Sequence, residues 1–592
     1  MNLLKNNISQ IEQIMRTLQR HIQRCSKLIN LESNGERVNP DSYLLKGKVS
    51  SFVKQQNIKY EKILSYSRNE PRMELIKRNF ERFLKFGIFL SNDKSINVDG
   101  FRLYNLRKWA NFTISTPEDN FPSISSYCNC DCEFCYEKGT RETPIFHRLG
   151  RKNLSLKEVD TRLRYYSYKD QKGIVPGSYL ALEAFLNPHC VEILERIHDA
   201  YPQSSIKLTT NGSFLTERVV ARLAKLKPIL LMVSLNAATV QMRQLVMHER
   251  SAESAQIAIN SFALLKKYDI PAEGSYVPWP SKPLSDMEEA LRIMDENDVV
   301  RARICMPSFT RYHGIEPFDT ETYWQEILSN VRTLRNKISI PIDVIPNSYE
   351  FQTSQPIIHG AIKNSPAARA GLRFGDRVVA IDGQEIYSIT EMHGVLAQRA
   401  QDGSFRKTTY TIERDGKIFD VELMHPKDIT KEPYPYRNIA KPGGSRWANS
   451  LGIHYTGGFS LTNVVRFLEA CKEYAGKRIL LFTSEFMEPH FREALDMFDV
   501  SEILDSVEVY VENPLHYFWG GNVKIGDLWT IPDLIAHTKF WMSKTGIRPD
   551  VVFVASSFLS IGKRDLLGNC YLNFERELDI ELRLIPCISV IE

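Results

Sequence analysis

The sequence predicts an α/β protein of several domains, and three observations support that prediction. Short apolar segments alternate with longer helical segments from about residue 120 to 345, which indicates parallel strands with helices outside them. A stretch near residues 356–425 is instead rich in turn residues and short strands. After about residue 448 the strand–helix alternation returns. A chain of 592 residues is long enough for about four domains of ~150 residues each.

Composition places the chain among ordinary globular proteins, with 43% hydrophobic and 25% charged residues. The net charge of +5, from 76 basic and 71 acidic residues, is too near balance to indicate nucleic-acid binding. The N-terminus lacks the apolar run of a signal peptide, and no stretch approaches the ~18 consecutive apolar residues of a spanning helix. The ten cysteines do not resemble a secreted disulfide framework. We expect a cytoplasmic protein with neither a membrane nor a nucleic-acid partner.

Residues 1–112 are expected to form a helical N-terminal region. Apolar residues recur at three- and four-residue steps between Ile8 and Leu28, which is an amphipathic pattern. A second helical stretch runs roughly from Arg72 to Phe86. We interpret this region as a cap or a dimer surface rather than as a catalytic element.

Residues 113–348 carry the first strand–helix alternation. The expected strands are Pro122–Tyr127, Ser178–Glu183, Ser205–Thr210, Ile229–Leu235, Ala272–Val277 and Arg301–Met306. The expected helices are His189–Ala200, Thr216–Leu226, Ala252–Tyr268 and Ser285–Asn297. Repeated strand–helix units form a parallel sheet, and ligands bind at the carboxyl ends of such strands.

A cluster of cysteines directly follows the first expected strand. Residues 128–135 read Cys-Asn-Cys-Asp-Cys-Glu-Phe-Cys, in which Cys128, Cys132 and Cys135 have the spacing C-x3-C-x2-C. Soft thiolates select zinc, Cu(I) or iron–sulfur clusters, and a structural zinc site normally needs four protein ligands. Since no second cysteine pair follows, three ligands on one loop favour a [4Fe–4S] cluster with one open iron. A zinc knuckle or incidental free thiols are the alternative.

This spacing, with Phe134 before the last cysteine, resembles the signature of the radical S-adenosylmethionine (SAM) enzymes. The resemblance implies a partial (βα)6, TIM-like barrel with the cysteine loop at its mouth and Phe134 in the cofactor site. It also implies that Cys128, Cys132 and Cys135 hold a [4Fe–4S] cluster, which cleaves SAM reductively to a 5′-deoxyadenosyl radical for hydrogen abstraction. Cys130 is a spare thiol or an alternative ligand; we favour the spare, because the pattern is complete without it. No single catalytic side chain is indicated.

Other cofactor contacts are implied at later strand ends. Glu183, in the segment Leu180–Pro188, lines up with the acidic position of the family's Gly-Gly-Glu-Pro segment, although Ala181 and Leu182 replace its glycines. A carboxylate there can accept hydrogen bonds from the methionine ammonium of SAM. An ordinary solvated carboxylate is the equally weighted alternative.

Ser234 and Asn236 lie at the end of the fourth expected strand, where the family contacts the ribose hydroxyls. Hydroxyl and amide groups suit that contact. Capping of the following helix is the alternative role for these residues.

Residues 349–428 predict a separate β domain, and the stretch Gly360–Gly383 resembles a bacterial PDZ domain. Ser365-Pro366 opens a short helix that Gly371 ends, and Gly375-Asp376 and Asp382-Gly383 form turns. Strands Lys407–Arg414 and Lys417–Leu423 follow, joined by Asp415-Gly416. No Gly-Leu-Gly-Phe-like carboxylate loop precedes the first strand, so the sequence leaves peptide binding open.

Residues 429–447, rich in proline and glycine, are expected to be a linker, and residues 448–592 a second α/β domain. Its expected strands include Arg478–Thr483 and Val507–Val511, and the stretch His516–Thr530 resembles the DUF512 family. That family combines PDZ, radical-SAM-like and DUF512 regions in one chain. Here the radical SAM part precedes the PDZ part.

Together these resemblances imply a radical SAM enzyme whose PDZ-like and C-terminal domains shape or recruit a substrate, a peptide or a small molecule. An electron donor such as a flavodoxin or ferredoxin is the implied partner. The alternative is a PDZ-type binding or scaffold protein with a catalytically degenerate barrel. A zinc protein is a second alternative.

Overall fold

The computed structural model describes residues 96–98, 101–103, 124–135, 138–139, 153–163, 183–202, 205–316, 318–402, 407–439, 450–455, 459, 461–496, 501–559 and 563–585. Within residues 1–112 this covers only the antiparallel strands β1 (Ile96–Val98) and β2 (Phe101–Leu103). The helices expected in that region lie outside the described residues. Within the described segments, every helix is too short or too polar to cross a bilayer.

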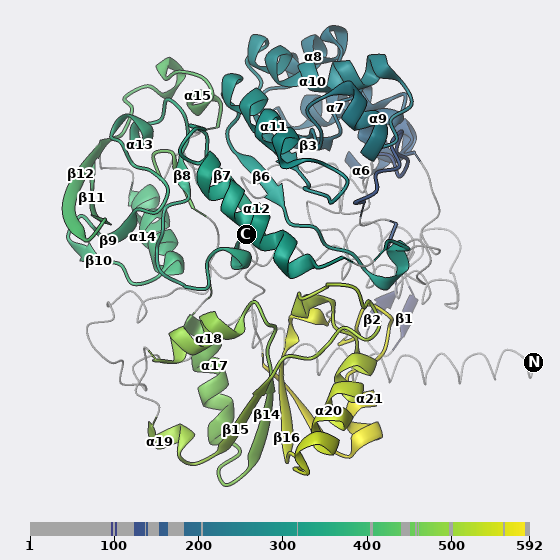
Figure 1. The fold of residues 1–592 in the computed structure, drawn as a ribbon, viewed down its shortest axis with the longest axis vertical. Helices are drawn as coiled ribbons and strands as arrows, with labels where there is room; N and C mark the ends of the chain where they lie inside the picture. The colour runs from purple at the N-terminus through teal and green to yellow at the C-terminus, as the bar shows by residue number, and fades with distance from the viewer. Residues whose placement is uncertain are drawn as a thin grey trace, which may run out of the picture.

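The first domain contains a parallel sheet whose strand order follows the chain (Figure 1). Its strands are β3 (Ile206–Thr210), β4 (Ile229–Ser234), β5 (Ala272–Tyr276), β6 (Ala302–Cys305) and β7 (Ile342–Ile345). Its helices are α6 (Leu156–Leu163), α7 (Cys190–Ala200), α8 (Glu217–Leu223), α9 (Val240–Val246), α10 (Ala252–Lys267), α11 (Leu284–Glu296) and α12 (Thr320–Leu334), with short 3-10 turns η3 (Ala184–Leu186), η4 (Ala224–Leu226), η5 (Arg311–His313) and η6 (Asn347–Tyr349). This is the sheet of a partial barrel.

Alternating side chains explain why these strands form. Leu208, Leu231 and Val233 are buried against the helices, whereas the intervening residues of β3 and β4 are exposed or half-buried. Four of the expected strands are confirmed as β3 to β6, and the four expected helices correspond to α7, α8 with η4, α10 and α11. The sequence did not indicate β7, because Asp343 interrupts its short apolar run.

The first two expected strands are not found among the described residues. Ser125 forms only an isolated bridge with Asn153, so the described part of Pro122–Tyr127 is not a strand. Glu183 is the described residue of Ser178–Glu183, and its side chain caps η3; the rest of that range lies outside the described residues. The backbone N–H of Glu183 donates to the Tyr127 carbonyl, which joins the ends of the two ranges, while the Glu183 side chain accepts from Phe185 N.

The second domain is the expected β domain. Its elements are β8 (Gly360–Ala361), α13 (Pro366–Arg369), β9 (Arg377–Ile381), β10 (Gln384–Glu385), α14 (Ile389–Asp402), β11 (Lys407–Arg414) and β12 (Lys417–Met424). The Ser365 side chain caps α13 by accepting from Ala368 N, as Ser-Pro predicted. Asp415 and Gly416, both with positive φ, form the turn between β11 and β12. The expected turns and strands of this domain are therefore confirmed.

A later segment completes this domain. Strand β13 (Ile453–His454) pairs antiparallel with β8, and Leu451, Ile453 and Tyr455 pack in the same core as Val378 and Ile412. The sequence predicts that residues from 448 onwards belong to the C-terminal domain. Packing instead places residues 450–455 with the β domain.

The segment expected to be a linker is packed where the structure describes it. It contains η7 (Ile429–Lys431) and α15 (Tyr436–Ile439). Arg437 pairs with Asp269 at 2.6 Å, and Asn438 donates to the Asp269 carbonyl at 3.2 Å. Ile439 shares a small core cluster with Val300 and Ile362. Residues 429–439 therefore hold the β domain against the barrel.

The C-terminal domain is a second parallel α/β unit, at the bottom of Figure 1. Its sheet has the order β15 (Glu508–Glu512), β14 (Arg478–Phe482), β16 (Val551–Ala555), β17 (Glu581–Ile585). The accompanying helices are α17 (Leu461–Lys472), α18 (Glu488–Asp496), α19 (Ser501–Leu504), α20 (Ile531–Thr545) and α21 (Leu572–Leu578), with η8 (Gly526–Leu528) and η9 (Ser556–Phe558). The expected strands there correspond to β14 and β15.

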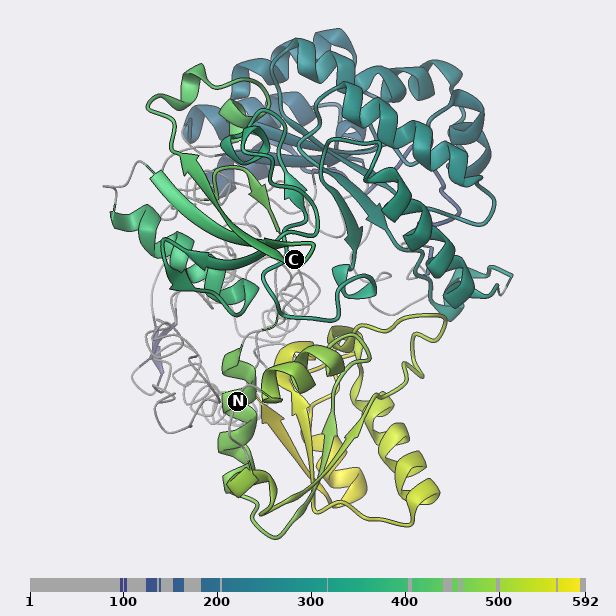
Figure 2. The same cartoon turned by 60° about the vertical axis from the view of Figure 1, so that its left-hand side comes forward.

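The C-terminal domain docks on the loop that follows β6. Arg311 N donates to the Trp519 carbonyl at 2.8 Å, and Phe309 N donates to Asn522 Oδ1 at 2.8 Å. Gly521 lies so close to Phe309 that a Cβ there would be 2.0 Å from the Phe309 oxygen. The carboxyl ends of the β14–β16 strands thus point toward the barrel (Figure 2).

Candidate active site at the barrel mouth

The cysteine loop is fixed to the carboxyl side of the barrel sheet by its backbone. Asp131 N donates to the Met247 carbonyl and Glu133 N donates to the Val246 carbonyl, both at 2.9 Å. These two acceptors end α9, the helix that follows β4. The loop therefore lies over the strand ends, where the sequence predicted it.

The thiols of this loop differ in their surroundings. Cys128 is exposed, Cys132 and Cys135 are half-buried, and Cys130 is buried at 9% exposure. The Cys128 thiol donates a hydrogen bond to the Cys130 sulfur, which raises the pKa of the Cys128 thiol, and partial desolvation of this thiol raises it further. Among the described residues, no three His, Cys, Asp or Glu side chains are gathered tightly enough to hold one metal ion.

Glu183 is fully buried at 0% exposure, so it is not the solvated surface carboxylate that we gave as the alternative. Thr210 Oγ1 donates to its Oε1 at 2.9 Å, and Asn211 N donates to its Oε2 at 2.7 Å. Burial raises the pKa of Glu183 to about 7, although these hydrogen bonds lower it. Glu183 is thus joined to the carboxyl end of β3.

Asn211 links this carboxylate to the cysteine loop. Its side-chain Nδ2 donates to Asn129 Oδ1 at 2.7 Å and lies 3.6 Å from Cys130 Sγ and 3.9 Å from Cys128 Sγ. N–H groups directed at sulfur stabilise a thiolate relative to a thiol. The Thr-Thr-Asn-Gly sequence at the end of β3 therefore donates hydrogen bonds both to the Glu183 carboxylate and to the cysteine loop.

Ser234 ends β4, Asn236 lies two residues later, and both side chains contact β5 or the residue after it. Ser275 Oγ donates to Ser234 Oγ at 3.3 Å, and Asn236 Oδ1 accepts from Val277 N at 3.0 Å. Asn236 has a positive φ of 56°, which the side-chain bond to Val277 supports. Asn236 does not cap α9, because Thr239 does so by accepting from Met242 N. The helix-capping alternative is therefore wrong for Asn236.

Lys282 is a buried cation that the sequence did not single out. Its Nζ donates to the Asn236 carbonyl at 2.7 Å and also to the Val277 carbonyl. The same ammonium lies 4.6 Å from the centroid of the Phe134 ring and 4.0 Å from that of Tyr276. Burial lowers the pKa of Lys282 to about 7. Lys282 thus connects the β4 end to the cysteine loop.

A buried ion pair fixes the ends of β3 and β4 relative to each other. Arg243, at 0% exposure, pairs with Glu249 at 2.6 Å. Its guanidinium also donates to the carbonyls of Leu235 and Asn211. The roles of Lys282 and Arg243 could not be predicted from a motif, because each side chain contacts residues that are distant in the sequence.

Comparison with known families decides the class of this domain. Residues 123–294 match the model of the radical SAM superfamily, and residues 357–403 match the PDZ domain. The chain carries a radical SAM domain followed by a PDZ domain. The radical SAM match includes the cysteine loop, Glu183, Asn211, Asn236 and Lys282, so all the contacts above lie within it.

Curated relatives match only short pieces. A protein of Brucella suis named "Putative zinc metalloprotease" is 37% identical over 95 residues, which are 16% of this chain and 24% of that protein. A protein of the same description from Mesorhizobium japonicum is 28% identical over 118 residues, 19% of this chain and 31% of that one. The chain spans about a quarter of the length of such relatives, so their name is not transferred.

Two solved structures are similar to part of the chain. SuiB of Streptococcus suis bound to S-adenosylmethionine covers 38% of this chain and 49% of its own, with 17% identity and a TM-score of 0.28. Methylornithine synthase (PylB) covers 52% of this chain and 78% of its own, with 13% identity and a TM-score of 0.27. At these scores the likenesses add nothing to the family match.

Proposed function

We propose that the radical SAM domain binds a [4Fe–4S] cluster through Cys128, Cys132 and Cys135 and binds SAM beside it. The bound cluster and SAM would supply one-electron cleavage of the sulfonium to a 5′-deoxyadenosyl radical, which abstracts hydrogen from a substrate. The observation that carries this proposal is the pair of contacts made by Asn211: its backbone N–H donates to Glu183, and its side-chain Nδ2 lies 3.9 Å from Cys128 Sγ.

The donor chemistry supports the cluster. Of the three thiols, Cys128 lies beside the side-chain amide of Asn211, and the buried Lys282 ammonium lies against Phe134 of the same loop. Positive charge and N–H donors offset the negative charge of thiolates. Cys130 is the fourth thiol of the loop, and we assign it as a spare thiol and not as a cluster ligand.

The chain's own residues would position SAM. Glu183 offers carboxylate oxygens at the end of β3 for the methionine ammonium, and Ser234 and Asn236 offer polar groups at the end of β4 for the ribose. Phe134 and Trp279, with ring centroids 6.3 Å apart, form an apolar wall that limits water at the loop.

The remaining domains would act on the substrate. We propose that the PDZ domain and the C-terminal domain shape or recruit it, and that a flavodoxin or ferredoxin supplies the electron in the cytoplasm. The docking of the C-terminal domain on the loop after β6 supports this division, since it sets that domain at the barrel mouth. The DUF512-like character of residues 448–592 stays a prediction.

Anaerobic reconstitution tests the proposal. We expect about four iron atoms per chain and formation of 5′-deoxyadenosine from SAM under reducing conditions. Cys128→Ala, Cys132→Ala and Cys135→Ala should each lose the iron and the product, whereas Cys130→Ala should keep both. Cys570→Ala, in the C-terminal domain, is the matched control. A Cys130→Ala protein without iron would overturn the ligand assignment, and iron-loaded protein that forms no 5′-deoxyadenosine would favour the scaffold alternative.

A further inference from the structure

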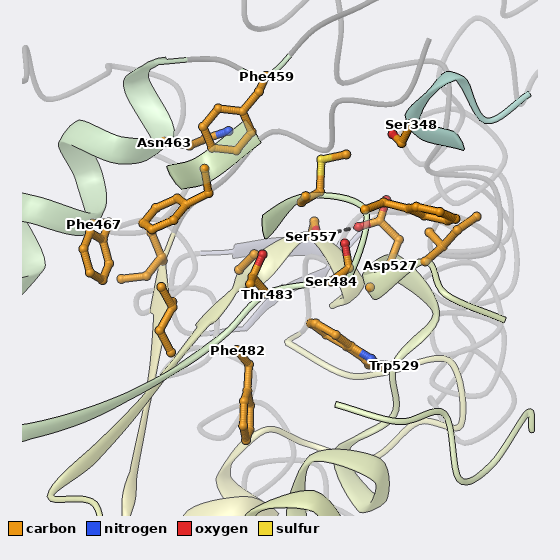
Figure 3. Close-up of a pocket in the computed structure, with 18 of the residues that line it drawn as sticks. Ser348, Phe459, Asn463, Phe467, Phe482, Thr483, Ser484, Asp527, Trp529 and Ser557 are labelled. Atoms are coloured by element: carbon orange, nitrogen blue, oxygen red, sulfur yellow. Dashed lines mark hydrogen bonds between the residues drawn. The ribbon is translucent and has the colours of Figure 1, made fainter. Parts of the chain in front are cut away.

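A cavity of about 120 Å³ lies in the C-terminal domain, at the carboxyl ends of β14 and β16 (Figure 3). Thr483 and Ser484, which follow β14, line one side, and Ser557, just after β16, lines another. Pro346 and Ser348, which follow β7, line it from the barrel domain. In open α/β sheets ligands bind outside the carboxyl ends of the strands. The cavity therefore lies where such a sheet takes a ligand.

The walls of the cavity are mostly apolar, with several aromatic side chains. Phe459, Phe467, Phe482 and Trp529 line it, and none of them is more than 7% exposed. An apolar cavity of about 150 Å³ is large enough to bind benzene. The volume and walls here thus suit one six-membered ring or an apolar body of similar size.

Asn463 and Asp527 are two of the polar side chains in these walls, and both offer oxygen atoms that accept hydrogen bonds. Asn463, at 7% exposure, has an Oδ1 atom without a hydrogen-bond partner in the described part of the chain, and Figure 3 shows this side chain beside Phe459 at the cavity. Asp527 also lines the cavity and accepts a hydrogen bond from Ser557 Oγ at 2.5 Å. A buried acceptor without a donor is costly, so a ligand that brings an N–H would gain free energy at Asn463.

The residues that line the cavity exclude one common class of ligand. Among the described residues of the lining none is Lys, Arg or His, so a phosphate or carboxylate would find no cationic partner among them. An anion would also lie near the Asp527 carboxylate in an apolar surrounding, which is unfavourable. Nucleotides, which often bind at such strand ends, do not fit this lining.

We propose that this cavity binds a small apolar amine, with its ring or chain against the phenylalanines and Trp529 and its N–H groups directed at Asn463 Oδ1 and Asp527. An ammonium is favoured further by aromatic faces and by the carboxylate. The site is independent of iron and SAM. Because Pro346 and Ser348 contribute to it, the ligand contacts both domains.

Four probes of similar size test the proposal on the full-length protein, by calorimetry and by NMR of the protein's methionine methyl groups: benzylamine, benzyl alcohol, toluene and benzoate. We expect benzylamine to bind at least tenfold more tightly than toluene or benzoate, with benzyl alcohol between them, as one charge-assisted hydrogen bond implies. The methyl resonance of Met487, which lines the cavity, should shift on binding, and Met487→Leu identifies that resonance.

Matched variants locate the effect. Asn463→Leu should weaken benzylamine about tenfold and leave toluene within about twofold, whereas Asn463→Asp, which keeps an acceptor, should retain benzylamine binding. Ala555→Phe, which fills the cavity, should abolish binding of all four probes. Asn260→Leu, on the exposed face of α10, is the control for the substitution itself.

Three results would overturn the proposal: benzoate binding as tightly as benzylamine, an unchanged benzylamine-to-toluene ratio in folded Asn463→Leu, or no binding of any probe. If Asn463→Leu does not fold, the probe series and Ala555→Phe still decide. Binding that survives Ala555→Phe and leaves the Met487 resonance unmoved would place the amine elsewhere, which also refutes the site.

Discussion

The ammonium of Lys282 lies 4.6 Å from the centroid of the Phe134 ring, directly behind the cysteine loop. The same ammonium donates hydrogen bonds to the backbone carbonyls of Asn236 and Val277. One buried cation therefore supports both the aromatic residue of the cysteine motif and the strand end expected at the ribose of SAM.

Replacing Lys282 by Met should loosen this arrangement. The variant leaves two carbonyls without a donor, which costs roughly 1–3 kcal/mol in free energy of unfolding. Urea denaturation measures this loss, and gel filtration of reconstituted protein should show faster release of iron. Lys337→Met, at an exposed pair with Glu288, is the control and should change neither. Equal stability of the two variants would show that Lys282 does not support the loop.

Glu183→Ala should weaken SAM binding roughly tenfold to a hundredfold, because one or more charged hydrogen bonds are lost. Since Glu183 also accepts from Thr210 and Asn211, the variant should be less stable as well. Glu183→Gln keeps an acceptor and separates the two effects: we expect it to preserve folding but still weaken SAM. Calorimetric titration of SAM measures the affinity. Wild-type affinity in folded Glu183→Gln would restrict Glu183 to a structural role.

Gly521→Ala should disturb the docking of the C-terminal domain on the barrel. A Cβ at Gly521 would lie 2.0 Å from the Phe309 oxygen, whereas one at Gly546 would meet nothing within 4 Å. Both glycines have positive φ, 61° and 71°, so Gly546→Ala measures the backbone strain alone. We expect Gly521→Ala to lower the melting temperature more than Gly546→Ala and to speed limited proteolysis between the domains. Equal effects of the two variants would argue against a tight contact.

The free energy of unfolding should decrease as the pH is lowered, because of His516. Burial against Trp529 lowers the pKa of His516 to about 4, whereas an unfolded histidine titrates near 6.5. Between these values the unfolded chain binds a proton that the folded chain does not, so the free energy of unfolding decreases as the pH falls from about 6.5 to 4. The full loss is roughly 3 kcal/mol.

His516→Phe should flatten this pH dependence, and urea denaturation at several pH values measures it. His248→Phe is the comparison, since His248 is exposed. A slope that remains unchanged in His516→Phe would assign the effect to another group.

Local signals were sufficient for much of the fold. Ser365-Pro366, Asp382-Gly383 and Asp415-Gly416 predicted their caps and turns because each acts within a few residues. The periodic strands β3 to β6 were found for the same reason. The cysteine motif was visible because its chemistry lies in its spacing.

What escaped prediction depends on distant partners. β7 is short and interrupted by Asp343, which pairs with His454, at 2.7 Å, and with Arg301, at 2.9 Å. Lys282 has no motif, and its role arises from carbonyls and rings supplied by other segments. The burial of Glu183 could not be predicted either, because nothing in the sequence around this glutamate indicates that its side chain is buried.

The pairing of β13 with β8 joins residues separated by about ninety positions, from Gly360–Ala361 to Ile453–His454. During synthesis the first PDZ strands would leave the ribosome well before the strand that completes their sheet. The intervening segment, with Arg437 held by Asp269, must settle on the barrel in the meantime. We therefore expect the barrel and the PDZ domain to mature as one cooperative unit, and a nascent chain ending before residue 450 to remain sensitive to protease.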